Sequence, residues 1–148
     1  MSLTNVFNIA GTGMNAQSIR LNTTASNIAN AETVGSSEGD TYKARKPWFS
    51  VLEKQWDDVD RLNRKLDVRS QIGDGVKING IVESEAPLKK RFEPNHPMAD
   101  EEGYVLYPNV NVVEEMTDMM SSSRSYQMNV EVLKTAKQML QRTLTLGQ

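Results

Sequence analysis

The sequence predicts an α+β fold in which long N- and C-terminal helices pack as an antiparallel, coiled-coil-like pair, with a small β-rich domain between them in the chain. Both ends of the 148-residue chain carry apolar residues at alternating steps of three and four, the period of one helix face. The middle has short apolar runs separated by glycine and proline, which is typical of strands and turns. We therefore expect a helix at 1–34, a β-rich domain at 35–108 and a helix at 109–148.

The N-terminal helix is expected to have Ser2 as its N-cap, to run to about Ala31, and to be ended by Gly35. Its apolar stripe consists of Leu3, Phe7, Ala10, Met14, Leu21 and Ile28. Gly11 and Gly13 interrupt the helix at a cost of about 1 kcal/mol each relative to alanine. They indicate either local weakness in an exposed helix or the close approach of a neighbouring helix. Repeated asparagine and threonine compete for backbone hydrogen bonds, so we expect this helix to need partners.

The β-rich middle is expected to contain strands at 42–52, 76–82, 89–92 and 104–107. Gly73-Asp74-Gly75 is a turn signal directly before the second of these strands. The highly charged segment 54–70 fits either a short helix or a protruding hairpin, and the sequence leaves both alternatives open.

The C-terminal helix is expected to begin at Asn111 as its N-cap, with Glu114 at the spacing of a capping box, and to stop at Gly147. Acidic residues at its start and basic residues near its end suit the helix dipole. Its apolar stripe consists of Val112, Met116, Met119, Tyr126, Val130, Leu133, Ala136, Leu140 and Leu144. About 35 residues make a helix roughly 50 Å long. Such a length exceeds that of a typical globular helix and is characteristic of a coiled coil.

The composition excludes several classes of protein. A net charge of −2 argues against a dedicated nucleic-acid binder. The chain has no apolar run near the roughly 20 residues that span a bilayer, so we expect no membrane insertion. It has no cysteine, which excludes disulfides and thiolate metal sites. The N-terminus lacks the pattern of a cleaved secretory signal.

The sequence also lacks a convincing catalytic set. His96 is the only histidine and lies between two prolines, beside the acidic residues 100–102. A catalytic histidine needs an orienting partner and a converging nucleophile or metal, so we interpret His96 as a solvated loop residue. Gly11-Thr12-Gly13 and Gly73-Asp74-Gly75 lack the context of a phosphate-binding loop. We therefore expect no enzyme activity and no catalytic, metal or cofactor site.

Residues 25–33, Ala-Ser-Asn-Ile-Ala-Asn-Ala-Glu-Thr, resemble the signature of the bacterial flagellar rod and hook protein family. The motif positions are Ser26, Asn27, Ile28, Ala29, Asn30 and Thr33. Further blocks resemble a proximal-rod member of this family, at 42–47, 75–82, 93–100, 103–105, 107–116, 124–127, 130–139 and 142–148. The chain departs from the family pattern at 35–40 and across 54–70.

The resemblance implies a structural subunit of the flagellar basal-body rod, the drive shaft that crosses the periplasm. It implies an inner domain of both terminal helices and an outer β domain. The implied partners are other copies of the chain and other proximal and distal rod proteins, with the rod base and rings as further candidates. It also implies export by the flagellar type III apparatus without a cleaved signal. Five residues lie off the main stripe and are expected to face neighbours: Val113, Met120, Met128, Val132 and Met139.

Two other functions remain as alternatives. Amphipathic helices that bind partner helices also suit a soluble adaptor or an export chaperone. A well-folded monomer with both terminal helices protected from proteolysis would favour that alternative. A small hydrolase using His96 is the third class, and His96→Ala would separate it, because we expect that substitution to leave function intact.

Overall fold

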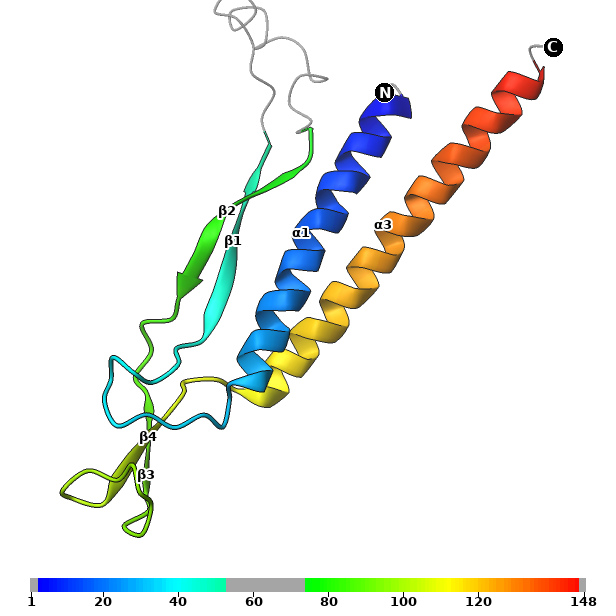
Figure 1. Ribbon diagram of the computed structural model, residues 1–148. Helices are drawn as coiled ribbons and strands as arrows, with labels where there is room; N and C mark the ends of the chain where they lie inside the picture. Colours follow the sequence, from blue (N-terminus) through cyan, green and yellow to red (C-terminus); the bar gives the residue numbers. More distant parts are fainter. Residues whose placement is uncertain (1–2, 53–73, 147–148) are drawn as a thin grey trace, which may run out of the picture. The chain divides into compact units, whose positions relative to one another are not determined.

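The computed structural model of the chain describes residues 3–52 and 74–146. Its elements are α1 (Leu3–Ala29), β1 (Arg45–Val51), β2 (Val76–Glu83), β3 (Lys89–Phe92), β4 (Tyr104–Tyr107) and α3 (Val112–Leu146) (Figure 1). Two long terminal helices with short strand pairs between them confirm the predicted α+β class. The predictions for Ser2, Gly147 and segment 54–70 fall outside the described residues.

The strands form two separate two-stranded sheets, β1 with β2 and β3 with β4. β3 and β4 are antiparallel, with Lys89 opposite Tyr107 and Phe92 opposite Tyr104. The later three strands lie where the sequence places them, to within one residue. β1 begins three residues later than predicted, because the segment before it is held by side chains: the Ala44 backbone N–H donates to Asn109 Oδ1 at 2.7 Å.

The described residues fall into two compact units. One comprises Met1–Ser18, Phe49–Asn79 and Arg124–Gln148, and the other comprises Ile19–Trp48 and Gly80–Ser123. Each unit contains part of α1 beside part of α3 (Figure 1). In the first unit Gly13 faces Asn129, and in the second Arg20 pairs with Asp118. Within each unit, part of α1 therefore contacts part of α3.

The division of the chain into segments at 1–34, 35–108 and 109–148 stays a prediction. Each of the two units contains residues of both helices and of the middle of the chain.

The hydrophobic core of the described residues is small. The buried apolar residues are Ala10, Ala16, Ala31, Ala44, Val105, Val110 and Ala136. Five of these are alanines and none is larger than valine. One cluster joins Ala31, Ala44 and Val110, with Tyr42 and Val112 packed against it. Little apolar surface is therefore available to stabilise this part of the chain alone. Neither described helix has the length and hydrophobicity that crossing a membrane requires.

Candidate assembly surface

The two glycines of α1 have different surroundings. A Cβ atom built on Gly13 would lie 2.9 Å from Asn129 Nδ2, closer than carbon atoms come to such groups in proteins. A Cβ on Gly11 would have nothing within 4 Å. At Gly13 the structure therefore supports close approach of the neighbouring helix. At Gly11 it leaves a flexible residue facing open space.

The buried face of α3 is small and polar. Glu115, Ser122, Asn129 and Ala136 follow one another at intervals of seven residues, the repeat of a coiled-coil face. Glu115 is 4% exposed and Ser122 is completely buried, where its Oγ donates to the Asp118 carbonyl at 2.7 Å. Ala136 belongs to the predicted stripe, but sequence reasoning missed Glu115, Ser122 and Asn129 because it followed apolar residues only. The heptad spacing of small and polar residues was the signal that could have found it.

The predicted apolar stripes are only partly covered. On α1, Ala10 is buried, while Phe7, Met14, Leu21 and Ile28 are half-buried. On α3, Ala136 is buried, while Val112, Met119, Val130 and Leu133 are half-buried. The other members of the α3 stripe are exposed: Met116, Tyr126, Leu140 and Leu144. The side chain of Leu3 lies outside the described part of the chain. The role of both stripes in packing between subunits stays a prediction.

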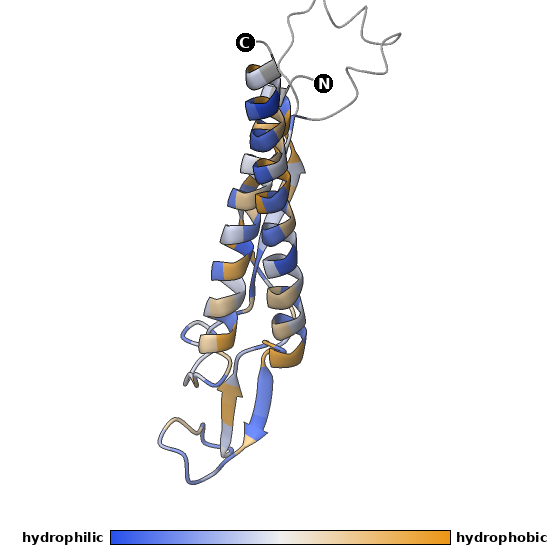
Figure 2. Ribbon diagram, turned by 90° about the vertical axis from the view of Figure 1, so that its right-hand side faces the viewer, coloured by the Kyte–Doolittle hydropathy of each residue, from blue (hydrophilic) through white to orange (hydrophobic). Residues whose placement is uncertain are grey.

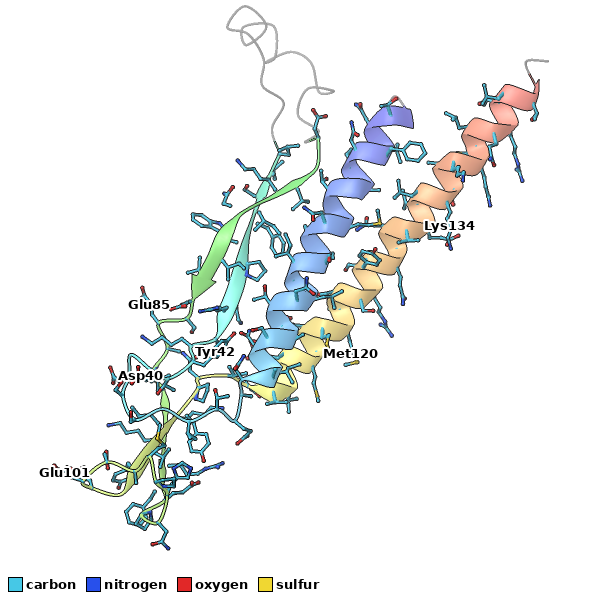
Figure 3. All side chains as sticks on the ribbon, in the orientation of Figure 1. Asp40, Tyr42, Glu85, Glu101, Met120 and Lys134 are labelled. Carbon is cyan, nitrogen blue, oxygen red and sulfur yellow. The ribbon has the colours of Figure 1, made fainter. Side chains whose placement is uncertain are left out.

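A second set of large apolar side chains on α3 is open to solvent. This outer apolar set consists of Val113, Met120, Met128, Val132 and Met139. Val113 is 73% exposed and Met120 is 63% exposed. Figure 3 shows Met120 on the side of α3 that faces away from α1 (Figure 3). Methionine adapts its shape to irregular partners, so these side chains suit a surface that meets other molecules.

The family motif connects the end of α1 to the chain before β1. Asn27 is 1% exposed. Its Nδ2 donates to the Arg45 carbonyl at 2.8 Å, and its Oδ1 accepts from the Tyr42 hydroxyl at 2.8 Å and the Arg45 N–H at 3.0 Å. Ser26 Oγ lies 3.3 Å from the same tyrosine hydroxyl. The motif therefore forms a buried polar clasp between the helix and an extended segment.

The rest of the motif ends the helix. Asn30 Nδ2 donates to the Ser26 carbonyl at 2.8 Å, and Thr33 Oγ1 donates to the Asn30 carbonyl at 2.7 Å. The same two carbonyls also accept from the backbone N–H groups of Asn30, at 3.1 Å, and Thr33, at 3.2 Å, so each has two donors at the end of the helix. Ile28 is half-buried and Ala29 is exposed.

A second clasp, which sequence reasoning missed, is made by Asn109. Its Oδ1 accepts from the Ala44 N–H, and its Nδ2 donates to the Ala86 carbonyl at 2.8 Å and to the Ser84 carbonyl at 3.4 Å. One amide thus joins three segments that lie far apart in sequence. Asn109 stands between Pro108 and the start of α3, where the sequence favours a turn.

The start of α3 differs from the predicted capping box. Asn111 is the N-cap, since its Oδ1 accepts from the Val113 N–H at 3.2 Å. The Glu114 carboxylate, however, pairs with Lys46 Nζ at 3.1 Å. Both side chains of this pair are more than half exposed, so it contributes little stability. The half-buried pair of Arg20 with Asp118, 3.0 Å apart, also links α1 to α3.

The loop between β3 and β4 has an organised polar structure. His96 Nδ1 accepts from the Met98 N–H at 3.1 Å, which fixes a local turn. Within residues 3–52 and 74–146, no group of three or more histidine or acidic side chains is placed to hold a metal ion.

On β3, the Arg91 guanidinium lies 4.7 Å from the centre of the Tyr107 ring. Interaction with Tyr107, and more weakly with Glu93, raises the pKa of Arg91 above its ordinary value, so this side chain remains cationic.

Known families match both ends of the chain. The family described as "Flagella basal body rod protein" matches residues 7–35, which contain most of α1, including Asn27. The family described as "Flagellar basal body rod FlgEFG protein C-terminal" matches residues 101–146, which contain β4 and α3. Both matches define the class of flagellar basal-body rod proteins.

Similarity to individual proteins identifies one family within this class. The flagellar basal-body rod proteins FlgC of Salmonella typhimurium and Escherichia coli O157:H7 are each 47% identical over 148 residues, which cover all of both chains. FlgC of Borreliella burgdorferi is 36% identical over 154 residues, which cover all of this chain and 99% of the relative. The chain belongs to the FlgC family of flagellar basal-body rod proteins.

Proposed function

We propose that this chain, a structural subunit of the flagellar basal-body rod, polymerises with other rod proteins through its two terminal helices to form the torque-transmitting shaft. The observation that carries the proposal is the contrast between core and surface. The described residues bury no apolar side chain larger than valine, while the outer apolar set of α3 is exposed. Covering one such side chain contributes about 1.5–3 kcal/mol, less the entropy lost on association.

The surfaces suit an open assembly. Contacts between different faces of identical subunits generate helical structures when they do not close into a ring. In this proposal the half-buried stripes of α1 and α3 stabilise the subunit and complete their burial in the rod. The outer apolar set contacts neighbouring subunits. The Asn27 and Asn109 clasps then hold the connecting segments in one geometry, because a fully hydrogen-bonded buried network specifies a unique arrangement.

The remaining features follow from family membership and are part of the same proposal. The partners are other copies of the chain and other proximal and distal rod proteins, and the subunit acts in the rod across the periplasm. It reaches that place through the flagellar type III export apparatus without cleavage of a signal. Its role is structural and not enzymatic, in keeping with relatives that are named as rod proteins.

The test replaces two exposed methionines of the outer apolar set, Met120→Asp with Met128→Asp. Because both side chains are more than 60% exposed, we expect the circular dichroism of the purified chain to stay unchanged. We expect rod assembly and swimming to be lost, since each substitution places an unpaired carboxylate in an apolar contact. The readouts are counts of basal bodies by electron microscopy and spreading in soft agar.

The matched control is Gln127→Asp with Thr135→Asp, which adds the same charges at exposed polar positions of α3. We expect this variant to swim. Normal rods in the methionine variant would overturn the proposal. A methionine variant and a wild type that both behave as stable monomers with protease-resistant helices would favour an adaptor or chaperone instead.

A further inference from the structure

One edge of β3 has no partner strand among the described residues. β4 pairs with one side of β3, and on its own far side β4 forms a bridge through Leu106 to Gly35. All four residues of β3 are exposed, and three of them are basic: Lys89, Lys90 and Arg91. Figure 2 shows the contrast between hydrophilic β3, in blue, and more hydrophobic β4, in orange (Figure 2).

These basic residues line a pocket of about 300 Å³. Its other lining residues are Ala31, Glu32, Tyr107, Val110 and Val112. Lys89 Nζ donates to the Val110 carbonyl at 2.6 Å, which holds this side chain across the pocket. Arg91 rests on the Tyr107 ring. Lys90 makes no ion pair or hydrogen bond with any described residue. Glu93, which is not part of the lining, pairs with Arg91 at 3.5 Å. Lys89 and Lys90 still outnumber the remaining carboxylate, that of Glu32, and leave the pocket with a positive charge.

The loop at the other end of the same hairpin presents the opposite charge. Asp100 Oδ1 accepts from the backbone N–H groups of Glu102 at 3.0 Å and Tyr104 at 2.7 Å, which fixes the turn. The carboxylates of Glu101 and Glu102 are exposed and, among the described residues, have no hydrogen-bonding or ionic partner. Figure 3 shows Glu101 at the tip of the loop (Figure 3). The turn is therefore an ordered, acidic projection.

From these two features we infer that the basic pocket along β3 of one subunit receives the acidic turn at 100–102 of a second copy of this chain. The turn cannot reach the pocket of its own chain, because the two lie at opposite ends of the β3–β4 hairpin. The contact joins two different surfaces, so it can repeat from subunit to subunit, as an open helical assembly requires. This inference rests on the proposed function, since it names one contact within the assembly.

This contact determines how neighbouring subunits are aligned more than it determines how tightly they bind. Exposed ion pairs are worth about 0–1 kcal/mol each, whereas like charges brought together cost several kcal/mol and exclude wrong arrangements. Lysines on an edge strand also have a simpler use, which is to prevent pairing with other sheets. Only the first explanation predicts that exchanging the charges between the two surfaces restores assembly.

The first experiment exchanges the charges. One variant carries Lys90→Glu and Arg91→Glu, a second carries Glu101→Lys and Glu102→Lys, and a third carries all four substitutions. We expect each of the first two to reduce the number of assembled basal bodies about tenfold or more, because like charges then face each other. We expect the third to recover most of the loss. No loss in either charge reversal, or no recovery in the third variant, would overturn the inference.

The controls reverse the same charges at other exposed sites, with Lys43→Glu and Lys77→Glu for the first variant, and Glu38→Lys and Glu85→Lys for the second. Circular dichroism of each purified chain shows whether Arg91→Glu disturbs folding beside Tyr107.

A second experiment does not depend on reversing charges. The chain contains no cysteine, so introduced thiols are unique in it. Two differently tagged chains, Lys90→Cys and Glu101→Cys, are expressed together and oxidised in assembled basal bodies. We expect a dimer carrying both tags, because a disulfide forms only where the Cα atoms lie within about 7 Å. A pair with Glu85→Cys in place of Glu101→Cys is the control.

Absence of that dimer in assembled rods would contradict the inference and leave the proposed function standing. If instead the Met120 and Met128 variant assembles normally, the proposed function itself fails. The two outcomes are therefore distinguishable.

Discussion

At the scale of single residues, the side-chain amide of Asn27 makes three hydrogen bonds at a position where almost no solvent reaches. It replaces the water that the Tyr42 hydroxyl and the Arg45 backbone would otherwise need. Removing one partner of a buried hydrogen bond costs about 1–3 kcal/mol, because the other partner stays buried and unsatisfied. Asn27 therefore contributes to the stability of the fold mainly by satisfying the hydrogen bonds of Tyr42 and Arg45, and less by the burial of its own side chain.

We expect Asn27→Ala to lower the free energy of unfolding by about 2–3 kcal/mol, since it leaves the Arg45 N–H and carbonyl without partners. Urea unfolding followed by circular dichroism measures the change. Asn22→Ala is the matched control, because Asn22 is an exposed asparagine on the same helix, and its effect should be within about 0.5 kcal/mol. Equal effects of both substitutions would contradict the role of the clasp.

The two glycines of α1 provide a second residue-scale prediction. Gly11→Ala should stabilise the chain by about 0.5–1 kcal/mol, because alanine is the better helix former and its Cβ meets nothing within 4 Å. Gly13→Ala should gain less or lose stability, since its Cβ must displace the Asn129 side chain. The difference between the two melting temperatures is the measurement. Identical shifts would show that the helices do not approach closely at Gly13.

At the scale of elements, sequence periodicity located both long helices and three of the four described strands. β3 and β4 have the predicted limits, and α1 ends two residues before the expected Ala31. Local patterns suffice there because helices and hairpins are built from neighbouring residues. The start of β1 and the Asn109 clasp could not be predicted in this way. Each depends on a side chain that contacts a segment distant in sequence. The periodicity of a local segment carries no information about such a partner.

The same limit applies to the assembly surface. The apolar pattern did not predict the face of α3 that includes the fully buried Ser122. The neighbouring positions on that face, Glu115 and Asn129, are polar as well. The off-stripe residues Val113, Met120 and Met128 are exposed, which is compatible with the prediction that they meet neighbours. Only an assembled rod can test that prediction.

A substitution at Ser122 tests how tightly α3 is packed. Ser122→Leu should lower the free energy of unfolding by about 1–3 kcal/mol, because a fully buried site has no room for the larger side chain. Ser121→Leu is the control, since Ser121 is the exposed neighbour on the same helix. Thermal unfolding of both purified variants gives the comparison. A stabilised Ser122→Leu variant would mean that the helices are more loosely packed here than the structure indicates.

At the scale of the whole molecule, the small core makes stability depend on association. A state that binds partners is stabilised by mass action, whereas the described part of the free chain completely buries no apolar side chain larger than valine. The C-terminal part of α3 illustrates this, because residues 137–145 are all exposed. Such a helix end is expected to open readily until another molecule covers it.

Limited trypsin digestion of the free chain should therefore cut at Lys137 and Arg142 well before it cuts at Arg20, which is half-buried and paired with Asp118. In isolated basal bodies the first two sites should resist cleavage. Mass spectrometry of the fragments gives the order of cutting. Early cleavage at all three sites in assembled rods would contradict burial of α3 by neighbours.

The alanine-rich interior also has a calorimetric consequence. The heat-capacity increment of unfolding grows with the apolar area that becomes hydrated, and among the described residues only alanine and valine are completely buried apolar side chains. A small increment flattens the curve of stability against temperature. The lone subunit should accordingly be only marginally folded over a broad thermal range, with neither warming nor chilling changing it much, and incorporation into the shaft would be the event that fixes its shape.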